Sequence, residues 1–303
     1  MLTPKRVDVG PRAIDIPVAD FVGSAPGKTL LVTAGMDGDE YASIEAAYRL
    51  VEEFSRRDFR GRLVVVPIVN VMGFWNECSQ NPVDGLFPKA RLMGKQNGTS
   101  TERLMHWLTS TYAVNADCWF DAHGGAITER VRPLLWTWRA RTTSVIVDSL
   151  RQAQMAELFV DDVAHFGGGA AMLAQEGCAY VIGESGECGR REERDIARHT
   201  AWIHGVMHLL GMIDEAPTPI AQETCSKVAY VMAPMEGIWR PEPAAASITK
   251  GDVLGTCTSI DGRKRSTVKA PATGVRMFWK ETMALRRGDV VCAIAHPRGL
   301  TGG

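Results

Sequence analysis

Three carboxylates gather in a short turn near the N-terminus, within the segment GMDGDEYASIEAAYRL. Asp37, Asp39 and Glu40 stand between an apolar run that indicates a buried strand and a run with helical spacing. Acidic residues at a helix start commonly cap the helix, so capping is one interpretation. Carboxylates also bind divalent metals, and Asp37 and Glu40 could both point at one ion if the chain folds back at Gly38.

A histidine and a further glutamate follow two later apolar runs. His123 lies in FDAHGG, where Asp121 could fix the imidazole through a hydrogen bond. Glu184 follows the run CAYVIG and comes two residues before a glycine. Two carboxylates and one imidazole, from Asp37, Glu40 and His123, suit a three-ligand zinc site that leaves one position open for water. A lone histidine can equally be a core or surface residue, so the residue types alone leave both interpretations open.

The elements that must position these side chains alternate between two patterns. Apolar runs typical of strands lie at 29–35, 61–70, 118–125 and 178–186, and helical spacing occurs at 43–54, 101–112, 144–167 and 193–213. The alternation predicts an α/β fold with a mostly parallel or mixed sheet and helices on both faces. Ligands of such sheets bind beyond the carboxyl ends of the strands, which is where the polar turns would meet.

The last third of the chain has a different character. A polar, proline-containing stretch at 214–224 is the predicted linker between a catalytic domain at 1–213 and a small all-β domain at 225–303. The pairs APMEG/APATG and KGDVLG/RGDVVC indicate two half-copies of about 40 residues each. No cluster of acids and bases accompanies them, so we expect this domain to have a structural or oligomerisation role.

Composition excludes several classes of protein. The chain has 303 residues, of which 45% are hydrophobic and 23% charged, and its formal net charge is −1. This balance is typical of a globular protein and gives no electrostatic reason to expect nucleic acid or an anionic membrane as partner. No run approaches the roughly 18 apolar residues that span a bilayer, and the N-terminus lacks the apolar centre of a signal peptide. Seven cysteines without a CxxC pair indicate reduced thiols and a cytoplasmic location.

In order and spacing, these motifs resemble the succinylglutamate desuccinylase/aspartoacylase family of zinc-dependent deacylases, which are related to the zinc carboxypeptidases. The family motif Gly-x-His-Gly-Asp-Glu stands here as residues 35–40, with Asp37 in place of the histidine. The motif Asp-x-His-Gly stands as residues 121–124, and Glu184 takes the place of the catalytic glutamate. The resemblance covers nearly the whole chain. It implies a zinc-carboxypeptidase-like mixed sheet and a C-terminal barrel-like module that resembles a lipoyl carrier.

The resemblance also implies an activity, namely metal-dependent hydrolysis of the N-acyl amide bond of a small molecule. Asp37, Glu40 and His123 would hold one divalent ion, which would be zinc or, given the oxygen-rich ligands, manganese or iron(II). Asp121 would orient His123, and Glu184 would act as general base toward the attacking water. The expected partners are a small-molecule substrate and further copies of the chain in a homo-oligomer, without nucleic acid or membrane.

Two departures from the family pattern matter for function. Asp37 adds a negative charge to the ligand set, which would weaken the Lewis acidity of the ion. The arginines with which the family holds a substrate carboxylate fall on Ser79 and on the pair Lys89-Ala90. The remaining candidates for anchoring an anionic group are Lys89, Arg91, Arg190 and Arg191. A catalytically silent or repurposed homologue that binds a small molecule or a protein partner is therefore the alternative hypothesis.

Overall fold

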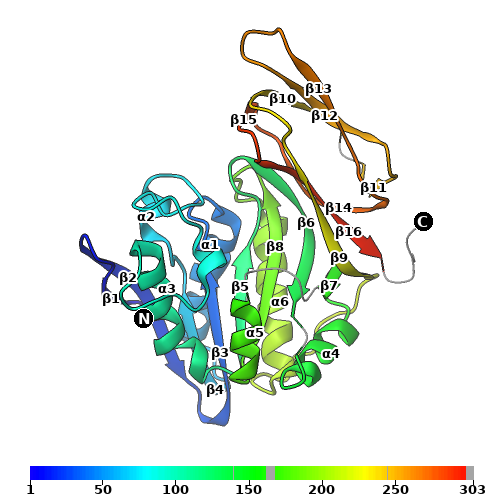
Figure 1. The fold of residues 1–303 in the computed structure, drawn as a ribbon. Coiled ribbons are helices and arrows are strands. Elements are labelled where there is room, and N and C mark those ends of the chain that lie inside the picture. Colours follow the sequence, from blue (N-terminus) through cyan, green and yellow to red (C-terminus); the bar gives the residue numbers. More distant parts are fainter. Residues whose placement is uncertain (139, 162–167, 244, 298–303) are drawn as a thin grey trace.

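A computed structural model describes residues 1–138, 140–161, 168–243 and 245–297 of the chain. Within them, a 12-stranded mixed sheet has the order β1-β2-β4-β3-β5-β8-β6-β7-β9-β16-β14-β11 (Figure 1). Its strands are β1 Thr3–Asp8, β2 Ala13–Val22, β3 Ala25–Ala34, β4 Arg60–Val66, β5 Cys118–His123, β6 Glu129–Thr137, β7 Leu158–Asp161, β8 Ala179–Glu187, β9 Glu223–Met232, β11 Ser247–Ile248, β14 Gly274–Lys280 and β16 Val290–Pro297. The α-helices are α1 Tyr41–Phe54, α2 Val71–Trp75, α3 Ser100–Thr111, α4 Ser144–Gln152, α5 Gly169–Gln175 and α6 Glu193–Leu209.

Alternate residues of the central strands supply two hydrophobic cores, because successive side chains of a strand point to opposite faces. Leu31 and Trp119 belong to the core that α3 and α5 cover. Leu30 and Phe120, one residue away in each strand, belong to the core beneath α1, α4 and α6. Helices therefore cover both faces, as the sequence predicts. Among the described residues, no helix combines the length and the apolar character that crossing a bilayer requires.

The carboxyl ends of the central strands meet at one edge of the sheet. β3 pairs in parallel with β4 and β5, and β5 pairs in parallel with β8. His123 stands directly opposite Glu184 in the register of β5 and β8. The turn after β3, the end of β5 and the end of β8 are thus brought together, which is the arrangement that the sequence predicts.

The sheet continues across the predicted linker. Residues 214–222 are in neither helix nor strand, whereas β9 begins at Glu223 and pairs in parallel with β7. β14 also pairs with β6, at Phe278 opposite Val131. The predicted α/β fold with an all-β C-terminal region is confirmed, and its two parts share one continuous sheet. The predicted domain boundaries themselves stay a prediction, and residues 298–303 of the last domain lie outside the described part of the chain.

A second, four-stranded sheet completes the C-terminal region, in the order β13-β12-β10-β15. Its strands are β10 Gly237–Pro241, β12 Val253–Thr258, β13 Arg265–Lys269 and β15 Ala284–Leu285. The predicted internal repeat is visible in two equivalent backbone hydrogen bonds of the C-terminal region. The amide of Ala233 donates to the carbonyl of Asp289, and the amide of Ala270 donates to that of Asp252. The first residue of each Ala-Pro motif thus donates to the aspartate carbonyl of the Gly-Asp-Val motif in the other half-copy, which confirms the repeat.

Candidate active site

The turn after β3 buries two carboxylates because it presses closely against the neighbouring helix. β3 ends at Ala34, and the chain reverses in the left-handed region at Gly35, where φ is +60°. A Cβ at Gly38 would lie 2.2 Å from backbone atoms of α2, so only glycine allows this approach. Asp37 and Glu40 are consequently 1% exposed, at the point where α1 begins.

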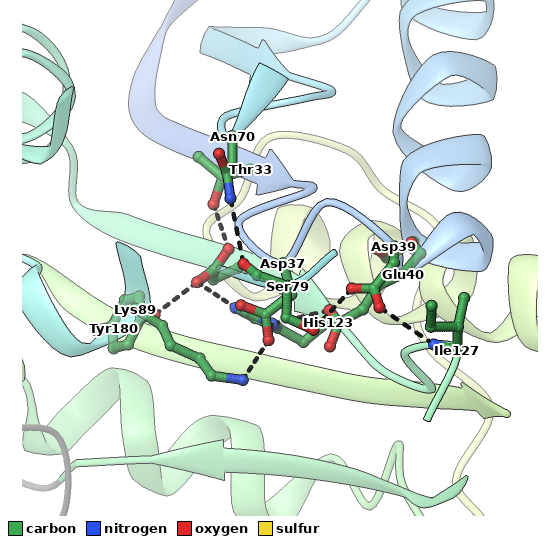
Figure 2. A network of polar contacts seen from close by, with 12 residues as sticks. Thr33, Asp37, Asp39, Glu40, Asn70, Ser79, Lys89, His123, Ile127 and Tyr180 are labelled. Carbon is green, nitrogen blue, oxygen red and sulfur yellow. Dashed lines mark hydrogen bonds and ion pairs between the residues drawn. The ribbon is translucent and has the colours of Figure 1, made fainter. Parts of the chain in front are cut away.

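Asp37, Glu40 and His123 form one buried cluster (Figure 2). Each offers a ligand atom, and these atoms all lie within 4.8 Å of one another. Nδ1 of His123 is 2.9 Å from Oε2 of Glu40 and 4.0 Å from Oδ2 of Asp37. The predicted ligand set is therefore assembled from two elements that are more than 80 residues apart in sequence.

Asp121 holds the imidazole of His123 from behind, as predicted. Its Oδ2 is 2.9 Å from Nε2 of His123 and accepts a hydrogen bond from the hydroxyl of Tyr180 at 2.6 Å, while its Oδ1 accepts one from Thr33. When the imidazole is neutral, a carboxylate beside Nε2 favours the tautomer that carries its proton there, and the lone pair of Nδ1 then faces Glu40. Burial lowers the pKa of His123, but the carboxylates of Asp121 and Glu40 outweigh it and raise that pKa well above its ordinary value.

Three buried polar atoms in the cluster form no hydrogen bond of regular geometry with the described residues. They are Oδ1 of Asp37, Oε2 of Glu40 and Nδ1 of His123. Buried polar atoms are rarely left unsatisfied. A proton on Nδ1 of His123 or a divalent cation would satisfy the 2.9 Å contact between Nδ1 and Oε2 of Glu40, but only the cation would also serve Oδ1 of Asp37. Carboxylate oxygen and imidazole nitrogen are common ligands of zinc and related divalent ions. The residues present therefore fit a divalent ion.

Lys89 reaches the cluster from a 3₁₀ helix, η1 Pro88–Arg91, and its ammonium forms an ion pair with Oδ2 of Asp37 (Figure 2). Burial raises the pKa of Asp37 to about 6, with Lys89 opposing the shift. Burial lowers the pKa of Lys89, but Asp37 and Glu40 overcome it and raise that pKa well above its ordinary value. Lys89 thus pairs with Asp37 through Oδ2, and Oδ1 of Asp37 stays available.

Two further glutamates face the cluster. Burial, helped by the charge of Glu40, raises the pKa of Glu184 to about 8. Burial raises the pKa of Glu129 to about 7, opposed by Lys89 and supported by Glu40. Glu129 was not among the residues that the sequence singled out. Its position at the start of β6, shortly after the turn that follows His123, is the only signal that could have indicated it.

Asp39 does not cap α1. The N-cap of α1 is Glu40, and no side-chain hydrogen bond caps the helix. Instead, the carboxylate of Asp39 accepts hydrogen bonds from the hydroxyl of Ser79 at 2.7 Å and from the amide of Ile127 at 3.3 Å. The capping interpretation is therefore wrong for this residue, which ties together two loops that border the cluster.

Three predicted anchoring residues lie apart from the cluster. Arg91 is exposed and donates to the carbonyl of Ala90. Arg190 is exposed and pairs with Glu187 at 3.4 Å, and Arg191 is exposed at the edge of a separate apolar pocket. Among the residues that the structure describes, no hydrogen bond or ion pair joins any of these arginines to the cluster.

The fold and the cluster together define a class of α/β proteins that place a candidate divalent-metal site at the carboxyl ends of sheet strands. Residues 26–210 match the family profile described as the succinylglutamate desuccinylase/aspartoacylase catalytic domain. The chain belongs to this family, whose members hydrolyse N-acyl amide bonds.

Three relatives illustrate the likeness. The chain is 27% identical to the N-alpha-acetyl-L-2,4-diaminobutyric acid deacetylase of Halomonas elongata, over 93% of this chain and 86% of that one. The crystal structure of a succinylglutamate desuccinylase/aspartoacylase from Rhodobacter sphaeroides matches with a TM-score of 0.84 and 21% identity, over 98% and 95% of the two chains. The product-bound ectoine utilization protein EutE of Ruegeria pomeroyi matches with a TM-score of 0.84 and 22% identity, over 98% and 94%. The two structures support the fold.

Proposed function

We propose that the chain is a metal-dependent deacylase that removes an acyl group from a small amine-bearing molecule. The observation that carries the proposal is the buried trio Asp37, Glu40 and His123, whose possible ligand atoms all lie within 4.8 Å of one another. These residues would hold one divalent ion, with zinc as the first choice and manganese or iron(II) as alternatives. From the sequence, we also propose a cytoplasmic homo-oligomer.

The bound ion would supply a Lewis acid that polarises the acyl carbonyl and acidifies water. Glu184, opposite His123 in the sheet, would accept a proton from the attacking water at its carboxylate and deliver it to the leaving nitrogen. Asp121 would keep the proton of His123 on Nε2. Because Tyr180 and Thr33 satisfy the remaining hydrogen-bonding capacity of Asp121, the imidazole would stay oriented throughout the reaction.

Lys89 would offset the charge that Asp37 introduces. Asp37 and Glu40 bring two negative charges to the ligand set. In the family pattern, the ligands are two histidines and one glutamate, which bring one negative charge. The ammonium of Lys89 on Oδ2 of Asp37 makes that pair neutral as a whole, like the histidine it replaces. The Lewis acidity of the ion would thereby stay close to that of the family site.

The acid-rich surroundings favour a substrate that carries an amino group. Glu129 and Glu184 face the cluster. Ser79 and Ala90 stand where the resemblance places the arginines that serve a substrate carboxylate, and Ser79 and Lys89 are engaged with Asp39 and Asp37. A deacetylase relative is named for an N-acetylated diamino acid. We propose that Glu129 would bind the free ammonium of such a substrate by a charge-assisted hydrogen bond.

Elemental analysis of the purified protein, combined with an assay on N-α-acetyl-L-2,4-diaminobutyrate, tests the proposal. We expect bound or recruitable zinc, manganese or iron, and release of acetate. Glu184→Gln should lower turnover by about 10²- to 10⁴-fold at unchanged metal content. Glu129→Gln should mainly raise KM for substrates that carry a free amine. A protein that binds none of these metals and releases no acetate would support the catalytically silent alternative.

A further inference from the structure

A pocket of about 390 Å³ lies where α6 begins, behind β8 as viewed from the cluster. Glu184 faces the cluster, whereas the hydroxyl of the next residue, Ser185, donates to Asp195 of α6 at 2.7 Å, and Asp195 lines the pocket. Arg132 of β6 and Arg276 of β14 line it as well. The pocket is therefore separate from the candidate active site. Its lining residues come mainly from β6, β8 and α6 and from the C-terminal strand β14, elements that Figure 1 places at the junction of the two parts of the molecule.

Two of the four arginines that line the pocket are neutralised. Arg198 pairs with Asp195 at 2.9 Å and with Glu157 at 3.6 Å. Arg194 pairs with Glu187 at 3.2 Å. These two arginines thus engage all three carboxylates that line the pocket. No ion pair joins a lining carboxylate to Arg132 or Arg276 among the described residues.

Arg276 is buried, and no ion pair joins it to any residue that the structure describes. Its residue is 4% exposed, and its Nε is buried without a hydrogen-bond partner among the described residues. The guanidinium lies 5.7 Å from the ring of Trp279, a cation–π contact that satisfies no N–H group. A guanidinium stays charged at any pH that the fold survives, so burial cannot be relieved by loss of a proton.

Arg132, on the neighbouring strand β6, also has a buried Nε without an acceptor among the described residues. The residue as a whole is half-buried. β6 and β14 pair antiparallel, so that Arg132 and Arg276 enter the pocket from adjacent strands. Two guanidinium groups beside one cavity, each with a buried Nε that lacks an acceptor among the described residues, are suited to the oxygens of one anion.

We propose that this pocket binds the oxyanion group of a small molecule, with Arg276 and Arg132 donating to its oxygens. The group is a carboxylate or a phosphate, and the size of the pocket leaves room for the molecule that carries it. Because the anion would neutralise charge between β6, β14 and α6, its binding would stabilise the junction between the two parts of the sheet. The pocket would act as a second ligand site behind the catalytic edge.

Thermal unfolding and calorimetric titration of the full-length protein test the proposal. The probes are inorganic phosphate and acetate, each compared with chloride at matched ionic strength. We expect one or both probes to raise the Tm and to bind with a measurable heat. A response to phosphate alone would assign a tetrahedral anion, and a response to acetate would assign a planar one.

Arg276→Met separates this pocket from any anion binding at the cluster, which the variant leaves intact. In chloride buffer it should keep or raise the Tm, because it removes an unpaired buried charge, and it should abolish the response to the probe. Arg132→Met is the second variant and should weaken binding at least about tenfold. Arg263→Met, on an exposed turn, is the matched control and should change nothing.

Two results would overturn the proposal. One is a wild-type protein whose Tm and titration heats do not depend on phosphate or acetate. The other is a response that survives in both Arg276→Met and Arg132→Met, because the anion would then bind elsewhere.

Discussion

The cluster at the strand ends and the arginine pocket behind β8 both contain buried charged side chains, yet their buried atoms without hydrogen bonds are opposite in kind. In the cluster they include the carboxylate oxygens of Asp37 and Glu40, which only accept hydrogen bonds when ionised. In the pocket they are donors, on Arg132 and Arg276. Since buried polar atoms need partners, the first set calls for a cation and the second for an anion. The kind of atom without a hydrogen bond thus indicates the charge of the ligand that would suit each site.

The largest expected effect is stabilisation by metal. Zinc at about 1,000 times its Kd should stabilise the folded protein by about 4 kcal/mol, because the ion binds the assembled cluster and not the unfolded chain. Denaturant unfolding with zinc and with a chelator measures the difference. His123→Ala should abolish it, while Arg276→Met should leave it unchanged. Equal zinc stabilisation in His123→Ala would place the metal elsewhere and remove the contrast between the two regions.

The pairing of Asp37 with Lys89 should appear as coupling in a double-mutant cycle. Lys89→Met leaves a buried carboxylate without its partner, and Asp37→His leaves a buried ammonium without its partner, so each single change should destabilise the chelated protein. The double variant should be more stable than the sum of the two predicts, by about 1–3 kcal/mol. Free energies of unfolding in chelator measure the cycle. Additive effects would show that the two charges do not compensate each other.

His199 lies between the two regions and should make the protein acid-sensitive. Its Nε2 is 3.0 Å from the carbonyl of Ser185, and burial lowers its pKa to about 4 from an ordinary value of 6.5. The unfolded chain therefore takes up the proton first as pH falls, so stability falls between pH 6.5 and pH 4. From pH 7 to pH 5, the wild type should lose about 2 kcal/mol more than His199→Gln in denaturant unfolding. Parallel pH profiles for the two proteins would contradict this.

The smallest expected effect contrasts a paired arginine of the pocket with the unpaired one. Arg198→Met should destabilise the protein by about 1 kcal/mol, because it removes the ion pair of the buried Asp195 at the partly solvated rim. Arg276→Met should cause no such loss in chloride buffer. Chemical denaturation of both variants measures the difference. A loss as large in Arg276→Met would mean that Arg276 already has a stabilising partner.

Much of the fold could be predicted from the sequence, because burial leaves periodic traces. The continuous apolar runs correspond to β3, β4, β5 and β8, and the helical spacing corresponds to α1, α3 and α6. The helical segment predicted at 144–167 is confirmed only as α4 and is wrong at 158–161, where β7 forms, while residues 162–167 lie outside the described part of the chain. The repeated turns of the last third are also real. The linker was harder to place, because a sheet can continue through a change in composition, as it does where β9 pairs with β7.

By itself, the sequence determined which residue types stand at the carboxyl ends of the strands, and parallel pairing then had to bring Asp37, Glu40 and His123 together. Only the tertiary structure decided which distant groups neutralise them. The pairing of Lys89 with Asp37, 52 positions away, depends on the path of a loop. The approach of Glu129 to the cluster and the isolation of Arg276 depend equally on how β6 meets its neighbours. Periodicity encodes burial, whereas charge compensation depends on distances that only the folded chain sets.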